Sequence, residues 1–164
     1  MHDETNNIAG RNSQWREELR SALTAKERTA IPRVRMPELD PTYRVTTLTD
    51  EVNQGLSAEQ AVLEATRCLD CPDPQCITGC PVGIDIPGFI KNIQRSRPDL
   101  AAGVLRLTSA LPAVCGRVCP QERQCESKCI YHRMHKEPVA IGYLERFAAD
   151  SAAETAPAAP AAPV

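Results

Sequence analysis

The sequence is poor in aromatic side chains, in long apolar runs and in net charge. One tryptophan, three tyrosines and two phenylalanines in 164 residues allow only a thin apolar core. The formal net charge of -2 gives no electrostatic indication of nucleic acid binding. No apolar run has the length of a membrane span, and the first residues, MHDETNNIAG, lack a basic region followed by an apolar one. We therefore expect a soluble, cytoplasmic protein that binds neither nucleic acid nor a membrane.

A nucleotide-binding motif is also lacking. None of the eight glycines belongs to a G-x-G-x-x-G fingerprint or a P-loop, and strands do not alternate with helices in the pattern. We therefore expect no catalytic site here, and no binding of FAD or NADPH by these residues alone.

Cysteine, in contrast, is abundant and clustered. The run CLDCPDPQCITGCP spaces Cys68, Cys71, Cys76 and Cys80 as C-x2-C-x4-C-x3-C and ends in Pro81. A second set follows after a gap and consists of Cys115, Cys119, Cys125 and Cys129. Thiols at this density are typical of a soft metal centre, and eight are enough for two centres with four ligands each.

Three interpretations compete for these thiols. Structural zinc usually uses two short cysteine pairs separated by a longer finger, which differs from this contiguous run. Disulfides are disfavoured in a reducing cytoplasm. Iron-sulfur clusters fit best, either as an electron relay or as structural staples. His132 and His135 are further candidate ligands, but eight cysteines suffice, so we expect both histidines to be solvated or bonded to the backbone.

The proline after Cys80 suggests how the thiols divide. In two-cluster ferredoxin runs the cysteine that precedes proline ligates the other cluster. We therefore expect Cys68, Cys71 and Cys76 to share a centre with one thiol of the second set. Cys80 would join three later ligands.

The periodicity predicts helices separated by prolines. We expect an amphipathic helix within residues 12–30, an extended arm over 33–41, a capped helix from Ser57 to Cys68, and helices over 87–97 and 99–108. A loop is expected over 111–125 and a last helix after Pro138. The domains would be a tail over 1–32, a cysteine-rich domain over 33–150 and an Ala/Pro linker over 151–164.

Several side chains have expected positions. Leu100, Val104 and Leu107 should be buried in the helix over 99–108, and Ile141, Glu145 and Ala148 should share one face of the last helix. Arg117 either donates to a cluster sulfide or is solvated, and Gly79, Gly83 and Gly116 would let backbone N–H groups approach sulfur.

Three segments carry a resemblance to a known family. RCLDCPDPQCITGCPVGIDIPGFI, CGRVCPQERQCESKC and EPVAIGYLERF closely resemble the N-terminal iron-sulfur domain of the glutamate synthase small subunit. Similar domains begin dihydropyrimidine dehydrogenase and the NADPH-binding subunit of ferredoxin-linked transhydrogenases. The resemblance implies a mostly α domain, like an α-helical ferredoxin, organised around two 4Fe-4S clusters. It also implies that the chain is an isolated domain, or a separate subunit, of an oxidoreductase.

The resemblance further implies ligands and partners. One cluster would take Cys68, Cys71, Cys76 and Cys129, and the other would take Cys80, Cys119, Cys125 and Glu145, with Cys115 as the alternative to Glu145. Electrons would pass from NADPH to FAD in following domains or a separate subunit. They would then cross the clusters to the FMN of a glutamate synthase large subunit. The same relay in a dihydropyrimidine dehydrogenase or transhydrogenase, or a metal-stapled interaction module, is the alternative.

Overall fold

The structure of the chain, a computed structural model, describes residues 10–155. This part is built from helices and loops, without a strand, and its one isolated antiparallel bridge joins Glu38 to Asn53. The mostly α fold predicted from the sequence is confirmed. In order, the α-helices are α2 (Gln14–Ser21), α3 (Ala25–Ala30), α4 (Pro41–Arg44), α5 (Ala58–Thr66), α6 (Gln75–Thr78), α7 (Ile86–Gln94), α8 (Pro98–Arg106), α9 (Pro112–Val118) and α10 (Ile141–Thr155). The 3-10 helices η1 (Gln121–Arg123), η2 (Glu126–Lys128) and η3 (Ile130–Met134) lie between α9 and α10.

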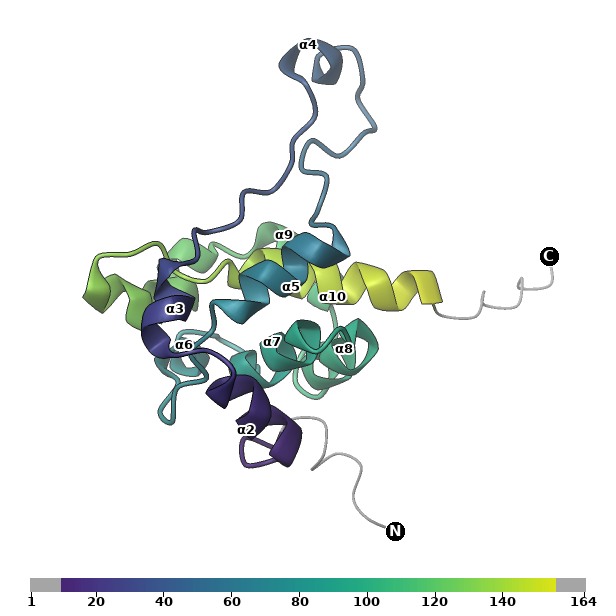
Figure 1. The fold of residues 1–164 in the computed structure, drawn as a ribbon. Helices are drawn as coiled ribbons and strands as arrows, with labels where there is room; N and C mark the ends of the chain where they lie inside the picture. Colours follow the sequence, from purple (N-terminus) through teal and green to yellow (C-terminus); the bar gives the residue numbers. More distant parts are fainter. Residues whose placement is uncertain (1–9, 156–164) are drawn as a thin grey trace, which may run out of the picture.

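Helix α10 organises the apolar core. It packs against α9, α8, α7 and α5, and Figure 1 shows it running through the middle of the body. Fully buried side chains from three helices meet there: Phe89, Ile93, Leu105, Leu144 and Ala148. Because these helices form a packed core, they can hold the cysteine loops at its edge. None of the described helices has both the length and the apolar composition needed to cross a bilayer.

Capping residues explain where the core helices begin. Ser57 and Gln60 form the predicted capping box at the start of α5. Asp85 accepts a hydrogen bond from Gly88 N at the start of α7, where Pro87 occupies the first turn. In α8 the buried stripe is Ala101, Val104 and Leu105. The predicted burial of Leu107 is wrong, because α8 ends at Arg106 and Leu107 is 63% exposed.

The N-terminal segment differs from its prediction. Instead of one helix over residues 12–30, α2 and α3 are separated at Thr24, which forms a capping box with Glu27. The buried residues are Arg16 and Arg28, whereas Trp15 is only partly buried. A hydrophobicity pattern could not find this packing, because the buried side chains are cations held by acceptors elsewhere in the fold.

The second cysteine set also differs from its prediction. The expected loop over 111–125 contains α9, which starts with Pro112 in its first turn and packs on α10. Helix α10 begins at Ile141 rather than directly after Pro138 and continues to Thr155, past the expected start of the linker at Ser151. The remaining linker residues lie outside the described part of the chain.

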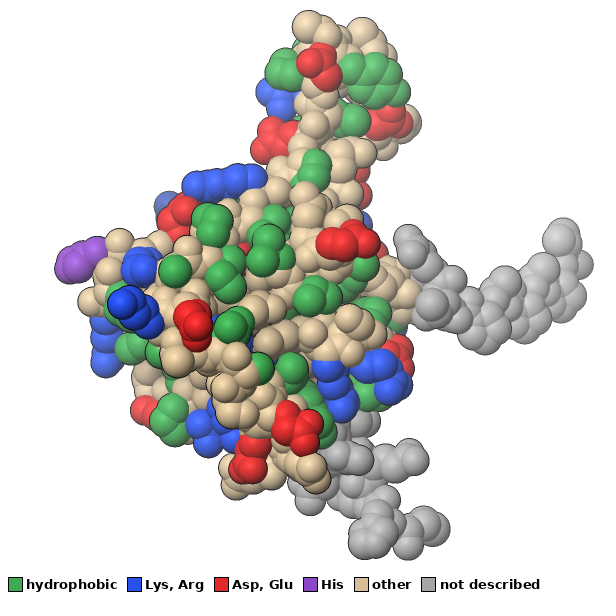
Figure 2. All heavy atoms as spheres, in the orientation of Figure 1, with side chains coloured by type: hydrophobic (Ala, Val, Ile, Leu, Met, Phe, Trp, Pro, Cys, Tyr) green, Lys and Arg blue, Asp and Glu red, His purple; other side chains and the backbone are tan. Residues whose placement is uncertain are grey.

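An extended arm leaves the body between α3 and α5. Residues 32–39 are extended as predicted, the chain turns through α4, and the bridge between Glu38 and Asn53 closes the arm near its base. Figure 1 shows the arm projecting well above the body, and Figure 2 shows apolar side chains on its surface. These include Val45 and Leu48, which are 77% and 103% exposed.

Candidate metal centres

The first cysteine loop starts where α5 ends. Cys68 N donates to Ala65 O at 3.1 Å in the last turn, and the chain then reverses at Asp70, whose φ is +53°. Cys76 lies within the single-turn helix α6, and Cys80 follows just after it. The loop is therefore held at both ends by helices, with its thiols between them.

Four thiols line one cavity. Cys68, Cys71, Cys76 and Cys129 border a cavity of about 380 Å³, which we call site one. By the same measure about 10–15 Å³ accommodates one water molecule, so the space is far larger than a single ion needs. Most other lining side chains are apolar, among them Ile86, Pro87, Ile90, Val139 and Ile141. The structure thus brings together the four thiols that the resemblance groups into one cluster.

Apolar surroundings control the protonation of these thiols. Burial, followed by the charges of Cys68 and Cys129, raises the pKa of the Cys71 thiol to about 11. Burial raises the pKa of Cys76 further still. Thiolates form here only if a positive charge compensates them, which a metal centre provides. Site one therefore suits a metal cluster better than free thiolates.

The remaining predicted ligands form a second neighbourhood, which we call site two: Cys80, Cys119, Cys125 and Glu145. Burial, then the charge of Glu126, and also the charges of Cys80 and Glu145, raise the pKa of Cys125 to about 12. The pKa of Cys119 is raised by burial, by Cys115, and also by Glu145 and Cys80. Cys80 and Glu145 thus act electrostatically on both Cys119 and Cys125.

Glu145 is the least expected member of site two. It points from α10 into the interior, is 5% exposed, and its buried Oε1 has no hydrogen-bond partner among the described residues. Burial alone raises its pKa to about 7. Glu145 forms no ion pair among the described residues, and neighbouring Arg146 pairs with Glu51 and Asp150 instead. A buried carboxylate oxygen without a donor is a suitable ligand for a metal.

Cys115 lies beside site two on α9. Its Sγ is 3.9 Å from Ser109 Oγ, and its backbone O accepts from Cys119 N at 3.1 Å. It does not line the cavity of site one. The fold therefore places two candidates, Cys115 and Glu145, near the three thiols of site two.

Two glycines let backbones approach closely, one between the two cysteine sets and one between α9 and α10. A Cβ on Gly79 would stand 2.7 Å from Gln124 O, and a Cβ on Gly116 would stand 2.6 Å from Arg146 N. Both distances are too short for a side chain, so these positions require glycine. Both glycines allow close packing of backbones, and the predicted approach of N–H groups to sulfur stays a prediction.

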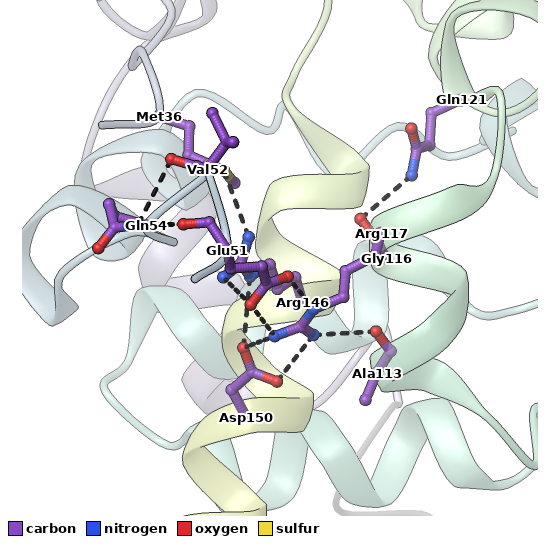
Figure 3. A network of polar contacts seen from close by, with 10 residues as sticks. All are labelled: Met36, Glu51, Val52, Gln54, Ala113, Gly116, Arg117, Gln121, Arg146 and Asp150. Atoms are coloured by element: carbon purple, nitrogen blue, oxygen red, sulfur yellow. Dashed lines mark hydrogen bonds and ion pairs between the residues drawn. The ribbon is translucent and has the colours of Figure 1, made fainter. Parts of the chain in front are cut away.

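Arg117 takes part in a polar network between three elements (Figure 3). It pairs with Glu51 of the arm at 2.6 Å and with Asp150 of α10 at 2.8 Å. Arg146 pairs with the same two carboxylates. Arg117 therefore anchors the base of the arm to α9 and α10, and neither predicted role applies to it.

Buried cations behind site one were missed by sequence reasoning. Asp70 is fully buried and accepts from Arg16 at 2.6 and 2.9 Å and from Arg20 at 2.8 Å. Burial would raise the pKa of Asp70, but these two arginines outweigh it and lower the pKa. Lys91 is also fully buried, and burial lowers its pKa to about 8. The available signal was a lysine inside the apolar helix IPGFIKNIQ.

His132 and His135 are exposed, as expected for solvated side chains. Within residues 10–155 no three His, Cys, Asp or Glu side chains converge as they would around a single ion. The thiols of site one surround a space and do not meet at a point.

Comparisons with known proteins agree with this arrangement. A family model described as dihydropyrimidine dehydrogenase domain II, 4Fe-4S cluster, matches residues 44–157, which include all eight cysteines and Glu145. The chain is 41% identical to the putative oxidoreductase UacF of Escherichia coli K12 over 103 residues, which are 62% of this chain and 16% of the relative. It is 35% identical to the glutamate synthase [NADPH] small chain of Azospirillum brasilense over 118 residues, 72% of this chain and 24% of the relative.

The name of a third relative refers to pyrimidine metabolism. The NAD-dependent dihydropyrimidine dehydrogenase subunit PreT of Salmonella typhimurium is 39% identical over 107 residues, 65% of this chain and 26% of the relative. The chain therefore spans about a quarter or less of the length of these relatives. The predicted resemblance is confirmed, and the chain belongs to the family of dihydropyrimidine dehydrogenase domain II, as a 4Fe-4S electron-transfer domain.

Proposed function

We propose that this chain holds two 4Fe-4S clusters, at site one and site two, and relays electrons between an NADPH- and FAD-binding module and a second flavin. The observation that carries the proposal is the convergence of Cys129 with Cys68, Cys71 and Cys76 on one cavity. Cys129 is far from the other three in sequence, so their meeting is a property of the fold. Iron-sulfur clusters are held by thiolates in this way.

The residues of the two sites would have different roles. The thiolates hold the clusters, while Ile86, Ile90 and Ile141 limit the access of water to site one. When bound, the clusters supply one-electron transfer. Glu145, an oxygen donor harder than thiolate, completes site two, and Cys115 remains a neighbouring free thiol.

The two sites lie close along the chain. Cys76 belongs to site one and Cys80 to site two, and α6 with its C-cap Gly79 joins them. Four helical positions correspond to a rise of about 6 Å. A short connection of this kind favours electron passage between the clusters over two unrelated structural staples.

The reaction we propose for the whole enzyme is reductive glutamate synthesis. Two small chains of glutamate synthase are 35% and 41% identical to this chain over 118 and 104 residues. The FAD- and NADPH-binding domains would be joined in the same polypeptide or supplied as a subunit, and the acceptor would be the FMN of the large subunit. Dihydropyrimidine dehydrogenase is the second candidate, because subunits of that name are 39% identical.

Cluster content tests the relay. Anaerobic reconstitution should give a brown protein with about eight iron and eight labile sulfide atoms per chain, and dithionite should produce an EPR signal of reduced clusters. A colourless protein that binds two zinc ions, or a brown protein that dithionite does not reduce, would contradict the relay.

Partner specificity needs a separate measurement. The dithionite-reduced chain should reduce the FMN of a glutamate synthase large subunit in stopped-flow absorbance, with a pyrimidine-reducing subunit as the control. Faster reduction of the control flavin would assign the chain to pyrimidine chemistry.

A further inference from the structure

Two cations are buried behind site one without a carboxylate partner. Lys91 of α7 donates from Nζ to Cys68 O and to Gln94 Oε1, each at 2.7 Å. Arg28 of α3 is 2% exposed and donates to Thr66 O at 2.5 Å and to Leu19 O. Neither side chain forms an ion pair within residues 10–155. Both therefore bring an uncompensated positive charge to the loop that carries Cys68.

Two nearby carboxylates are already engaged by other cations. Asp70 is held by Arg16 and Arg20, and Glu64 is held by Arg67 at 2.5 Å. Asp85 accepts from Gly88 N at the start of α7 and forms no ion pair in the described part of the chain. The positive charge of Lys91 and Arg28 is therefore left facing site one.

Both cations lie close enough to the thiols to affect them. The largest opposing charge felt by Lys91 and by Arg28 is that of Cys68. Burial raises the pKa of Cys129, and the charge of Arg67 opposes part of this rise. Lys91 is joined directly to a ligand residue of site one by its 2.7 Å hydrogen bond to Cys68 O.

Around site two the described charges are either paired or negative. The charge with the largest effect on Cys125 is the carboxylate of Glu126, which pairs with Arg33 at 2.9 Å. Glu145 contributes a buried carboxylate with no ion pair in the described residues. No buried cation without a carboxylate partner accompanies these groups among the described side chains of site two.

We propose that the cluster at site one is the more readily reduced of the two, and that Lys91 and Arg28 set this order. The proposal rests on the proposed function, because it requires a cluster at each site. Reduction adds one negative charge to a cluster, and a buried cation stabilises that charge more strongly than a solvated one. Electrons entering this domain therefore accumulate at site one before they leave.

The origin of Arg28 gives the inference a further consequence. Arg28 belongs to α3, which precedes the family match that begins at residue 44. The N-terminal segment thus adds one cation to a cluster site that the family shares. We expect this segment to raise the potential of site one without contributing a ligand.

Redox titration of the reconstituted chain, followed by EPR, tests the order. The signal lost in Cys119→Ala is assigned to site two, and the remaining signal, from site one, should have the higher midpoint potential in the wild type. Lys91→Met and Arg28→Gln should each lower the midpoint potential of site one. At a fixed solution potential, the ratio of reduced to oxidised cluster should then fall about tenfold. For a one-electron couple this ratio corresponds to about 59 mV.

Controls separate charge from structure. Lys26→Met removes an exposed lysine on α3 and should leave both potentials unchanged. Lys91→Arg and Arg28→Lys keep the charge and should retain most of the wild-type potential. If the substitutions acted only through the fold, the charge-conserving variants would shift the potential of site one as much as the charge-removing variants do.

Specific outcomes would overturn the inference. These are a lower wild-type potential at site one than at site two, or unchanged potentials in Lys91→Met and Arg28→Gln chains that still hold eight iron atoms. If the Lys91→Met chain loses its cluster, the potential of the Arg28→Gln chain and the order of the two wild-type potentials still test the inference. A wild-type chain without two clusters would instead refute the proposed function, so the two failures are distinguishable.

Discussion

At the scale of single residues, the position of one or two atoms decides which side chains can be metal ligands. Glu145 lies one residue before Arg146, yet the two side chains have opposite surroundings. Arg146 joins a network of ion pairs, whereas Glu145 Oε1 is buried without a donor. A carboxylate in such a position is stabilised only if a metal or a proton compensates it.

Separate substitutions of Cys115 and Glu145 identify the fourth ligand of site two. Cys115→Ser should keep about eight iron atoms per chain, whereas Glu145→Ala should lose the iron of one cluster, because it removes the only unpartnered oxygen described there. Iron and sulfide analysis with EPR measures both variants. Loss of a cluster in Cys115→Ser with retention in Glu145→Ala would make Cys115 the ligand.

Replacing each of two helical glycines with alanine should change stability in opposite directions. Alanine is favoured over glycine inside a helix by up to about 1 kcal/mol. At Gly103 of α8 a Cβ meets nothing within 4 Å, so Gly103→Ala should stabilise by about 0.5–1 kcal/mol. At Gly116 of α9 a Cβ would collide with the backbone of Arg146, so Gly116→Ala should destabilise by about 1–3 kcal/mol.

The measurement for this pair is thermal unfolding of the reconstituted chains, monitored by circular dichroism and cluster absorbance. Equal shifts in both variants would contradict the close contact between α9 and α10.

At the scale of elements, short helices are positioned by contacts distant in sequence. Helix α2 is held to the first cysteine loop by Arg16 and Arg20 on Asp70, and by Arg11, which donates to Asp70 O at 3.2 Å. A helix of eight residues is marginal by itself, so these contacts decide whether it stays docked.

Asp70→Asn should release α2 from the body. The substitution removes the carboxylate that pairs with the buried Arg16, which costs on the order of 3–5 kcal/mol. Limited proteolysis should then cut within residues 14–30 faster than in the wild type. The matched control is Asp99→Asn, which breaks an Arg–Asp pair with both side chains 51% exposed and should change stability by less than about 1 kcal/mol. Similar cleavage of both variants would show that α2 does not depend on Asp70.

At the scale of the whole molecule, the apolar core and the cysteine loops are separate sources of stability. Phe89, Ile93, Leu105 and Leu144 pack α7, α8 and α10 together without any candidate ligand among them. The cysteine loops rely instead on single-turn helices and on the ligands they share.

Removal of the metal should therefore loosen the molecule unevenly. After anaerobic chelation of iron, amide hydrogen exchange should increase most over residues 68–80 and 119–129, while α7, α8 and α10 should retain more of their protection. Mass spectrometry of the cluster-loaded and iron-free chains measures this directly. Uniform loss of protection would mean that the clusters, and not the apolar core, hold the helices together.

The sequence by itself determined the fold class, the capped helix α5, the extended arm and the set of candidate ligands. These features depend on local spacing: cysteines before prolines, a capping box, and apolar positions at helical intervals. Local spacing also placed Glu145 on the inner face of α10, where it is found.

Only the tertiary structure decided how the parts meet. It divided residues 12–30 into two helices, made α9 from an expected loop, and buried Arg28 and Lys91 behind site one. The physical reason is that a buried cation is stabilised by carbonyls and carboxylates from distant segments, so its burial cannot be read from its neighbours in sequence.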